Sequence, residues 1–188
     1  MENLIGKKLE EFTTPIYHEK SFGELKTEDL KGKWSVFFFY PGDFTFVCPT
    51  ELEDIANIYD KFEEADCEIY AVSTDSEFTH KEWHESSEAV GKAKYPMVAD
   101  RNFKLSKFFG VLMEEEGQAL RGTFIVNPEL EIVAYEVNSP GIGRNAKELL
   151  RKVQAAQFVA KFGDKVCPAA WEPGDEVLTP GIDLVGKI

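Results

Sequence analysis

Apolar positions along the chain form a few dense runs, separated by segments in which they recur at helical spacing. Residues 34–40, Trp-Ser-Val-Phe-Phe-Phe-Tyr, hardly alternate, which is typical of a central strand covered on both faces. The turn residues 41–43, Pro-Gly-Asp, end that run. Residues 49–62 then follow helical spacing, and residues 69–72 form a second apolar run. This order predicts a β–α–β unit with a right-handed crossover.

The second half of the chain predicts shorter elements of both kinds. Gly110 follows a short helical segment as a C-cap, and the turn at residues 127–129 separates two β-rich runs that we expect to form an antiparallel hairpin. The order of elements indicates an α/β fold with a central mixed sheet, flanking helices and one antiparallel edge. The expected helices cover residues 77–90, 102–109 and 145–162, and the expected strands cover residues 95–98, 123–126 and 132–137.

The end of the chain has a different pattern. Residues 163–188 are rich in proline and glycine and have no sustained periodicity, so we expect an extended C-terminal arm. The chain of 188 residues and 21.3 kDa suits one folded domain, which we place at residues 1–162.

Charge and apolar run length narrow the classes of function. The 34 acidic and 21 basic residues give a net charge of −13, which disfavours binding to nucleic acid and to anionic lipid. No apolar run is long enough to span a membrane, and no secretory signal pattern opens the sequence. Three cysteines are too few for a disulfide-stapled scaffold. We therefore expect a cytoplasmic protein with reduced thiols.

Cys48 lies where the first strand turns into the first helix, immediately before Pro49. The dipole and the free N–H groups of a helix N-terminus favour a thiolate, which is the nucleophilic form of cysteine. A small apolar residue that fills the start of a helix would have the same position, because free cysteines are commonly buried and inert. Position alone leaves both interpretations open.

The other two cysteines have different surroundings. Cys167 lies in the proline-rich arm, from which a thiol can reach another thiol, although an incidental cysteine there is the commoner case. Cys67 opens the strand that contains the second apolar run, and we interpret it as a core residue. No Cys-x-x-Cys pattern occurs, so neither a dithiol redox motif nor a zinc knuckle is expected.

Several other residues could either assist a reaction at Cys48 or form a different kind of site, such as a metal or cofactor site. Arg121 begins a predicted strand that would reach the Cys48 loop if it lies beside residues 34–40, and Thr45 precedes Cys48 by three positions. His80 and His84 share a helix face, but no further ligands accompany them and no metal is expected. The segments that precede helices lack a dinucleotide fingerprint, so we expect no cofactor.

The sequence resembles the peroxiredoxin family, in its typical two-cysteine form. The pattern Pro-x-x-x-Thr-x-x-Cys ends at Cys48, and the whole run of residues 39–51 is similar to the active-site signature of that group. The resemblance covers essentially the whole chain. Its other matching segments are Val166-Cys167-Pro168 with Trp171, Arg121-Gly122-Thr123-Phe124, Gly141-Ile142-Gly143-Arg144-Asn145 and the ending at residues 183–188.

The resemblance implies a thioredoxin-like fold and a peroxidase that reduces hydrogen peroxide and organic hydroperoxides, in antioxidant defence and redox homeostasis. Cys48 would be the peroxidatic cysteine, which becomes a sulfenic acid. Thr45 and Arg121 would bind the peroxide and the thiolate, and Pro41 would shield the site.

The resemblance also implies supporting residues and partners. Glu51 and Arg144 would orient Arg121, and Cys167 of the partner subunit would resolve the sulfenic acid as an intersubunit disulfide. A flavoprotein disulfide reductase that uses NADH, or a thioredoxin-like reductant, would recycle the disulfide. The family forms antiparallel homodimers that often assemble into decamers. A different hypothesis is a ring-forming holdase or redox-signalling adaptor, in which the thiols only sense oxidant.

Overall fold

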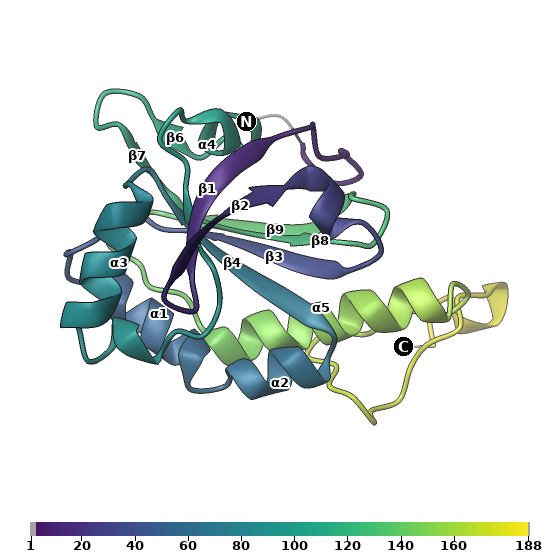
Figure 1. Cartoon of the computed structure of the whole chain (residues 1–188). Coiled ribbons are helices and arrows are strands. Elements are labelled where there is room, and N and C mark those ends of the chain that lie inside the picture. Colours follow the sequence, from purple (N-terminus) through teal and green to yellow (C-terminus); the bar gives the residue numbers. More distant parts are fainter. Residues whose placement is uncertain (1–2, 188) are drawn as a thin grey trace. The chain divides into compact units, whose positions relative to one another are not determined.

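The computed structural model describes residues 3–187, so Met1, Glu2 and Ile188, at the ends of the expected domain and arm, lie outside the described residues. Its internal contacts divide the chain into two compact units, one ending at Ala146 and one beginning at Lys147. The first unit contains a seven-stranded sheet in the order β2-β1-β5-β4-β3-β8-β9 (Figure 1). These strands are β1 (Thr13–His18), β2 (Ser21–Lys26), β3 (Trp34–Phe39), β4 (Cys67–Ser73), β5 (Met97–Ala99), β8 (Arg121–Val126) and β9 (Ile132–Asn138).

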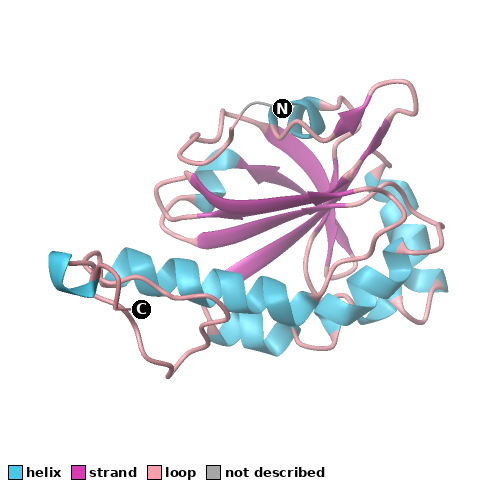
Figure 2. Ribbon diagram, turned by 180° about the vertical axis from the view of Figure 1, so that it is seen from behind, coloured by secondary structure: helices cyan, strands magenta, loops and turns pink. Residues whose placement is uncertain are grey.

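Helices of the first unit lie on both faces of this sheet, with α1, α2 and α3 on one side and α4 on the other (Figure 2). A separate two-stranded sheet pairs β6 with β7. The helices and short strands are η1 (Thr27–Leu30), α1 (Cys48–Ala56), α2 (Tyr59–Glu64), α3 (Glu77–Ser86), η2 (Val90–Lys92), α4 (Lys104–Phe108), β6 (Leu112–Met113) and β7 (Gln118–Ala119).

The pairing of the central strands confirms the expected mixed sheet. β3, β4 and β5 are parallel neighbours, as the predicted β–α–β unit requires. β8 pairs antiparallel with both β3 and β9, so the expected hairpin forms an antiparallel edge. The prediction of a single such edge was wrong, because β1 pairs antiparallel with β5 and β2 at the other side of the sheet. β8 therefore lies beside β3, which was the condition for Arg121 to reach the Cys48 loop.

β3 is apolar throughout because both of its faces are covered. Phe37 and Phe39 belong to the core cluster that also contains Phe109, at the C-cap of α4. Because side chains alternate along a strand, Val36 and Phe38 lie on the opposite face of β3, and all four residues are at most 2% exposed. Burial on two faces explains why the run does not alternate in sequence.

Phe109 joins two strands of this core. Its ring centroid lies 5.1 Å from those of Phe37 and Phe39 and 4.6 Å from that of Phe124, so β3 and β8 are both in contact with it. Tilted ring pairs at these distances add to the free energy gained from area burial.

The hairpin of β1 and β2 is absent from the sequence prediction. Its turn residues, Glu19 and Lys20, have φ values of 48° and 62°. Two consecutive positive φ values are typical of a type I′ turn, for which Asn-Gly is the usual sequence signal. Glu-Lys carries no such signal, so the hairpin could not be read from composition.

The helices predicted in the first unit have different bounds in the structure. The helix expected at residues 49–62 is broken into α1 and α2 at Asn57 and Ile58. The helix expected at residues 77–90 ends at Ser86, and the one expected at residues 102–109 is α4. Gly110 does follow α4 with a left-handed φ of 66°, as a C-cap should.

The second unit consists of α5 (Ala146–Lys161, which begins at the unit boundary) and the arm. The arm contains more structure than its composition indicates. Val166 and Leu178 form an isolated antiparallel bridge, and the Trp171 ring lies 5.0 Å from that of Phe158 on α5. A short 3-10 helix, η3 (Ile182–Leu184), follows. Within the described residues, no helix has both the length and the apolar character needed to cross a membrane.

Phe109→Ala tests the role of the aromatic core. We expect it to lower the free energy of unfolding by about 3–5 kcal/mol, because a fully buried ring leaves a cavity between strands and helix. Phe46→Ala is the control, since that ring is 93% exposed and its loss should change stability by less than about 0.5 kcal/mol. Urea denaturation at one fixed protein concentration measures both, and equal losses in the two variants would contradict this account of the core.

Candidate active site

Cys48 is the first residue of α1 and is completely buried. The N-cap residue Val47 makes no side-chain cap, and Pro49 follows Cys48 within the first turn. The sulfur therefore lies at the positive end of a nine-residue helix, as predicted.

Arg121 is brought to this sulfur by the sheet. It is the first residue of β8, and its side chain is 4% exposed. Nη1 donates to Cys48 Sγ at 3.4 Å and to Glu51 Oε2 at 2.6 Å, while Nε donates to the carbonyl of Pro140 at 2.7 Å. A hydrogen bond from a guanidinium is stronger when the sulfur is a thiolate than when it is a thiol.

Glu51 and Arg144 complete the buried ionic group. Arg144 donates to Glu51 from its backbone N–H, from Nε and from Nη2, at 2.8–2.9 Å. Arg144 Nη1 also donates to the Gly122 carbonyl, and the guanidinium carbon lies 3.4 Å from the centre of the Phe38 ring. These contacts leave Glu51 between two arginines from distant parts of the chain.

The charges of this group do not cancel. Burial by itself would raise the pKa of Glu51, but the hydrogen bonds and charges of Arg144 and Arg121 outweigh it, so the pKa lies below its ordinary value. Burial lowers the pKa of Arg144, and Glu51 opposes that change. One carboxylate and two guanidinium groups carry one net positive charge, and Arg121 directs it at Cys48 Sγ.

Thr45 and Pro41 lie in the turn between β3 and α1. Pro41 is buried, and Thr45 is half-buried with its hydroxyl donated to the carbonyl of Gly42 at 2.8 Å. The structure thus places both predicted residues in the segment that leads to Cys48. The hydroxyl of Thr45 keeps its oxygen lone pairs available to accept a further hydrogen bond.

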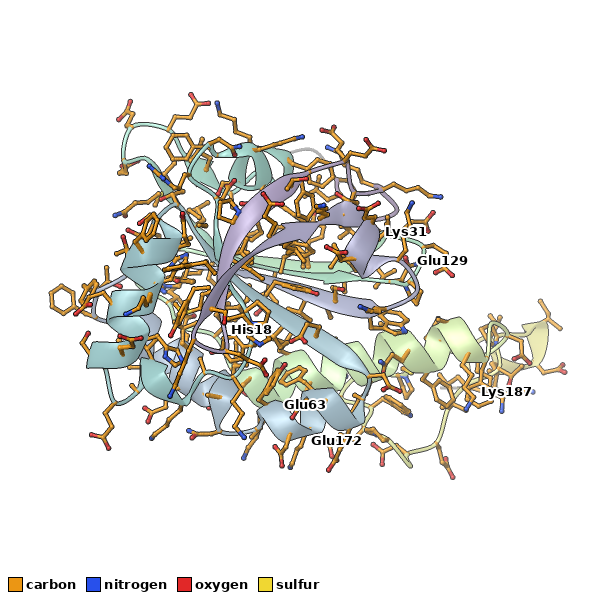
Figure 3. All side chains as sticks on the ribbon, viewed as in Figure 1. His18, Lys31, Glu63, Glu129, Glu172 and Lys187 are labelled. Atoms are coloured by element: carbon orange, nitrogen blue, oxygen red, sulfur yellow. The ribbon has the colours of Figure 1, made fainter. Side chains whose placement is uncertain are left out.

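The histidines are engaged away from the thiol. His18 lies at the end of β1 (Figure 3), and its Nε2 contacts the carbonyl of Lys94. His84 Nε2 contacts the carbonyl of Ala93. Among residues 3–187, no group of three His, Cys, Asp or Glu side chains has the arrangement of a metal site.

His80 is different from the other histidines, because it contacts the turn before Cys48, and sequence analysis did not indicate this contact. It is fully buried and its Nδ1 lies 2.7 Å from Asp43 Oδ2, on the turn that leads to Cys48. The two residues are 37 positions apart, so no local pattern could have signalled the contact.

Cys67 has the surroundings of a core residue. It begins β4, is 3% exposed, and burial with the nearby Glu68 charge raises the pKa of its thiol far above the ordinary value. A thiol held in this protonated form is a poor nucleophile.

Cys167 lies in the second unit and is half-buried. Its Sγ lies 3.9 Å from the Ala155 carbonyl on α5, and burial raises the pKa of its thiol while Arg151 opposes that effect. All three thiols are free.

A buried cysteine at a helix start, with an arginine N–H donating to its sulfur on a mixed sheet flanked by helices, is the arrangement expected of an oxidoreductase that works through a thiol. Comparison with known proteins identifies the family within this class. The chain belongs to the AhpC/TSA family of peroxiredoxins, whose family model matches residues 5–135. A second model, described as the C-terminal domain of 1-Cys peroxiredoxin, matches residues 155–183.

Individual relatives agree with this family. The chain is 50% identical to alkyl hydroperoxide reductase C of Escherichia coli K12 and 51% identical to that of Bacillus subtilis, over 99% of this chain and 100% of each relative. The crystal structure of Enterococcus faecalis AhpC matches with a TM-score of 0.87 at 56% identity, over 89% of this chain and 100% of that one. Reduced Plasmodium vivax 2-Cys peroxiredoxin matches with a TM-score of 0.91 at 32% identity, over 97% and 96%. The family supports a thiol peroxidase with an antioxidant role.

Glu51→Gln tests the buried ionic group. We expect a loss of about 3 kcal/mol in the free energy of unfolding at neutral pH, because two buried guanidinium groups lose their compensating charge. The folded pKa of Glu51 is lowered, so its carboxylate stabilises the fold above the unfolded pKa of about 4.3, and this contribution is lost as the pH falls through the folded pKa.

The difference between wild type and Glu51→Gln should therefore shrink in acid, which denaturant titrations from about pH 7 to about pH 3 will measure. Glu53→Gln is the matched control on the same helix, since its side chain is 34% exposed and pairs with Lys92 at the surface. Its expected cost is below about 1 kcal/mol. A Glu51→Gln loss no larger than that of the control would refute the compensating role.

Proposed function

We propose that Cys48 is the peroxidatic cysteine of this peroxidase. The thiolate attacks one peroxide oxygen of hydrogen peroxide or an organic hydroperoxide, so an S–O bond forms as the O–O bond breaks. The sulfur is oxidised by two electrons to a sulfenic acid, and the leaving oxygen takes a proton to become water or an alcohol. The observation that carries this proposal is the guanidinium of Arg121 at 3.4 Å from Cys48 Sγ, backed by a buried net positive charge.

The remaining site residues have supporting roles in this proposal. Arg121 and Thr45 hydrogen-bond the peroxide and stabilise the charge that develops on its oxygens. Pro41 shields the thiol from bulk water. Glu51 and Arg144 hold Arg121 in place, consistent with the four hydrogen bonds that the Glu51 carboxylate accepts from the two arginines.

Resolution of the sulfenic acid is assigned to Cys167 of a partner subunit. Two cysteines form a disulfide only when their Cα atoms come within about 7 Å. Cys48 is completely buried in its own chain, so the first turn of α1 must open before a thiol of another chain can reach it. In this scheme residues 1–162 form the peroxidase domain and residues 163–188 form the arm that delivers the resolving thiol.

Recycling requires an external reductant, because the cycle leaves a disulfide. We assign this step to a flavoprotein disulfide reductase, the AhpF component of an alkyl hydroperoxide reductase system, with electrons from NADH, or to a thioredoxin-like reductant. Such a cycle suits the reducing conditions of the cytoplasm, in which we place the protein.

Two surfaces of the first unit support a homodimer and a decamer. β9 is one of the two outermost strands of the sheet, so backbone groups along the strand beyond Ile132 are available for antiparallel pairing with a second copy. A group of exposed aromatic rings surrounds α3, where Phe22 packs on Phe78 and Phe44 lies on Trp83. Phe22, Phe44 and Phe78 are 50–60% exposed, which favours a contact between dimers.

The cysteine assignments predict a specific crosslinking pattern. After stoichiometric peroxide, a non-reducing gel should show a disulfide-linked dimer in wild type and in Cys67→Ser, but in neither Cys48→Ser nor Cys167→Ser. The reason is that only two of the three thiols take part in the proposed bond.

Steady peroxide consumption with a suitable reductase separates the enzyme from a holdase or a one-shot sensor. Loss of the crosslinked dimer in Cys67→Ser alone would overturn the assignment of the pair. Peroxide consumption by Cys48→Ser at the wild-type rate would overturn the peroxidatic role of Cys48.

Phe78→Asp tests the proposed contact between dimers. We expect sedimentation velocity to show decamers for the reduced wild type and dimers for Phe78→Asp, because a carboxylate would be buried without a partner in the assembled ring. Ile5→Asp, at an apolar position of similar exposure (51%, against 60% for Phe78), should remain decameric. Decamers of Phe78→Asp at all concentrations would place the contact elsewhere.

A further inference from the structure

A second buried ionisable group lies next to the proposed peroxide site and has no part in the chemistry described so far. His80 on α3 and Asp43 after β3 have fully buried side chains, with Nδ1 and Oδ2 separated by 2.7 Å. The other carboxylate oxygen of Asp43 accepts a hydrogen bond from the hydroxyl of Tyr40 at 2.8 Å. Both oxygens of Asp43 are therefore engaged inside the protein.

One proton is shared within the His80–Asp43 pair. His80 Nε2 lies 3.2 Å from the carbonyl oxygen of Val98, which only accepts, so Nε2 carries a hydrogen. The short contact on the other side of the ring then holds one further hydrogen, either on Nδ1 beside a carboxylate or on Oδ2 beside a neutral imidazole. In both forms a hydrogen bond joins His80 Nδ1 to Asp43 Oδ2, and at least one of its two groups is charged or strongly polar.

Asp75 holds the backbone of the same turn. Its Oδ2 accepts hydrogen bonds from the Asp43 backbone N–H at 2.8 Å and from Ser73 Oγ at 2.9 Å. Burial and the nearby Asp75 charge raise the pKa of Asp43, while His80 opposes the rise. Asp43 is thus fixed to three elements. Its backbone N–H donates to Asp75, which follows β4. Its side chain bonds to His80 on α3 and to Tyr40, which follows β3.

The chain beyond Asp43 is much less constrained. Phe44 has a left-handed φ of 56° and is 55% exposed, and Phe46 is 93% exposed. Thr45, between them, donates to the carbonyl of Gly42, the residue before Asp43. Asp43 is therefore the fixed end of the segment that carries Thr45 and leads to Cys48.

We propose that His80 is a positioning residue for the peroxide reaction and acts through Asp43. The His80–Asp43 bond holds the turn so that Thr45 and Cys48 face Arg121, and it opposes the opening of α1 that disulfide formation requires. This inference rests on the proposed peroxidatic role of Cys48. Loss of the bond slows the reaction with peroxide and speeds the later reaction with the resolving thiol.

Two substitutions of His80 separate its two hydrogen bonds. In His80→Asn the amide nitrogen takes the place of Nδ1 and keeps the bond to Asp43, whereas the contact with Val98 is lost. In His80→Gln the amide nitrogen takes the place of Nε2 and keeps the bond to Val98, whereas Asp43 Oδ2 loses the bond from residue 80 and Oδ1 keeps that from Tyr40. Both variants put an uncharged amide into the same buried place, so they form a matched pair.

We expect His80→Gln to lower kcat/KM for hydrogen peroxide about tenfold, the effect of one lost hydrogen bond to a buried charged group, and His80→Asn to stay within about threefold of wild type. Rapid-quench mass spectrometry, with a thiol-blocking reagent, resolves sulfenic acid formation from disulfide formation. In His80→Gln the first step should be slower and the second faster than in wild type. His84→Asn, one helical turn away, should leave both steps unchanged.

Equal slowing in the Asn and Gln variants, or slowing of both chemical steps together, would overturn the proposal in favour of general destabilisation. Asp43→Asn supplies a second test if both His80 variants fail to fold. Its amide donates to Nδ1 and accepts from Tyr40, so a rate near that of wild type supports the proposal and a tenfold loss overturns it. Cys48→Ser, measured alongside, reports separately on the peroxidatic role, because only failure of that role would leave its peroxide consumption intact.

Discussion

The arrangement of the candidate active site depends on one buried ionic group. Glu51 carries one negative charge between Arg121 and Arg144, so the group keeps a net positive charge in a place that water does not reach. Removing such charges from water is costly, and only the dense hydrogen bonding around the carboxylate offsets that cost. The uncompensated charge is directed at Cys48 Sγ, and the rest of the fold serves to keep it there.

The sheet assembles this group from distant segments. Arg121 begins β8, which runs antiparallel to β3, so its side chain lies at the end of the sheet where β3 leads into the Cys48 turn. In the proposed cycle, this position places two opposite demands on Cys48. A thiol that reacts selectively with peroxide benefits from burial, whereas a thiol that bonds to another chain must be exposed. The segment from Phe44 to α1, fixed at Asp43 and exposed beyond it, is the part of the first unit suited to change between these states.

Local sequence patterns were sufficient where the structure is built from near neighbours in the chain. The apolar run at residues 34–40 predicted a central strand because two-faced burial removes alternation. Pro49 and the turn before it predicted a helix start at Cys48. The patterns failed at two places. Glu19-Lys20 adopts a hairpin turn without the usual Asn-Gly signal, and the apolar spacing of residues 49–62 gives no sign of the break between α1 and α2.

By itself the sequence determined the fold class, the position of Cys48 at a helix start and, through a thirteen-residue motif, the family resemblance. The resemblance also grouped Glu51 and Arg144 with Arg121, but only the tertiary structure shows how these charges meet and that Asp43 meets His80. Glu51 and Arg144 lie 93 positions apart, and Asp43 and His80 lie 37 apart. Side chains so far apart have no periodic relation along the chain, because their contact is set by strand order and register. Those two quantities arise from long-range packing, which no local pattern encodes.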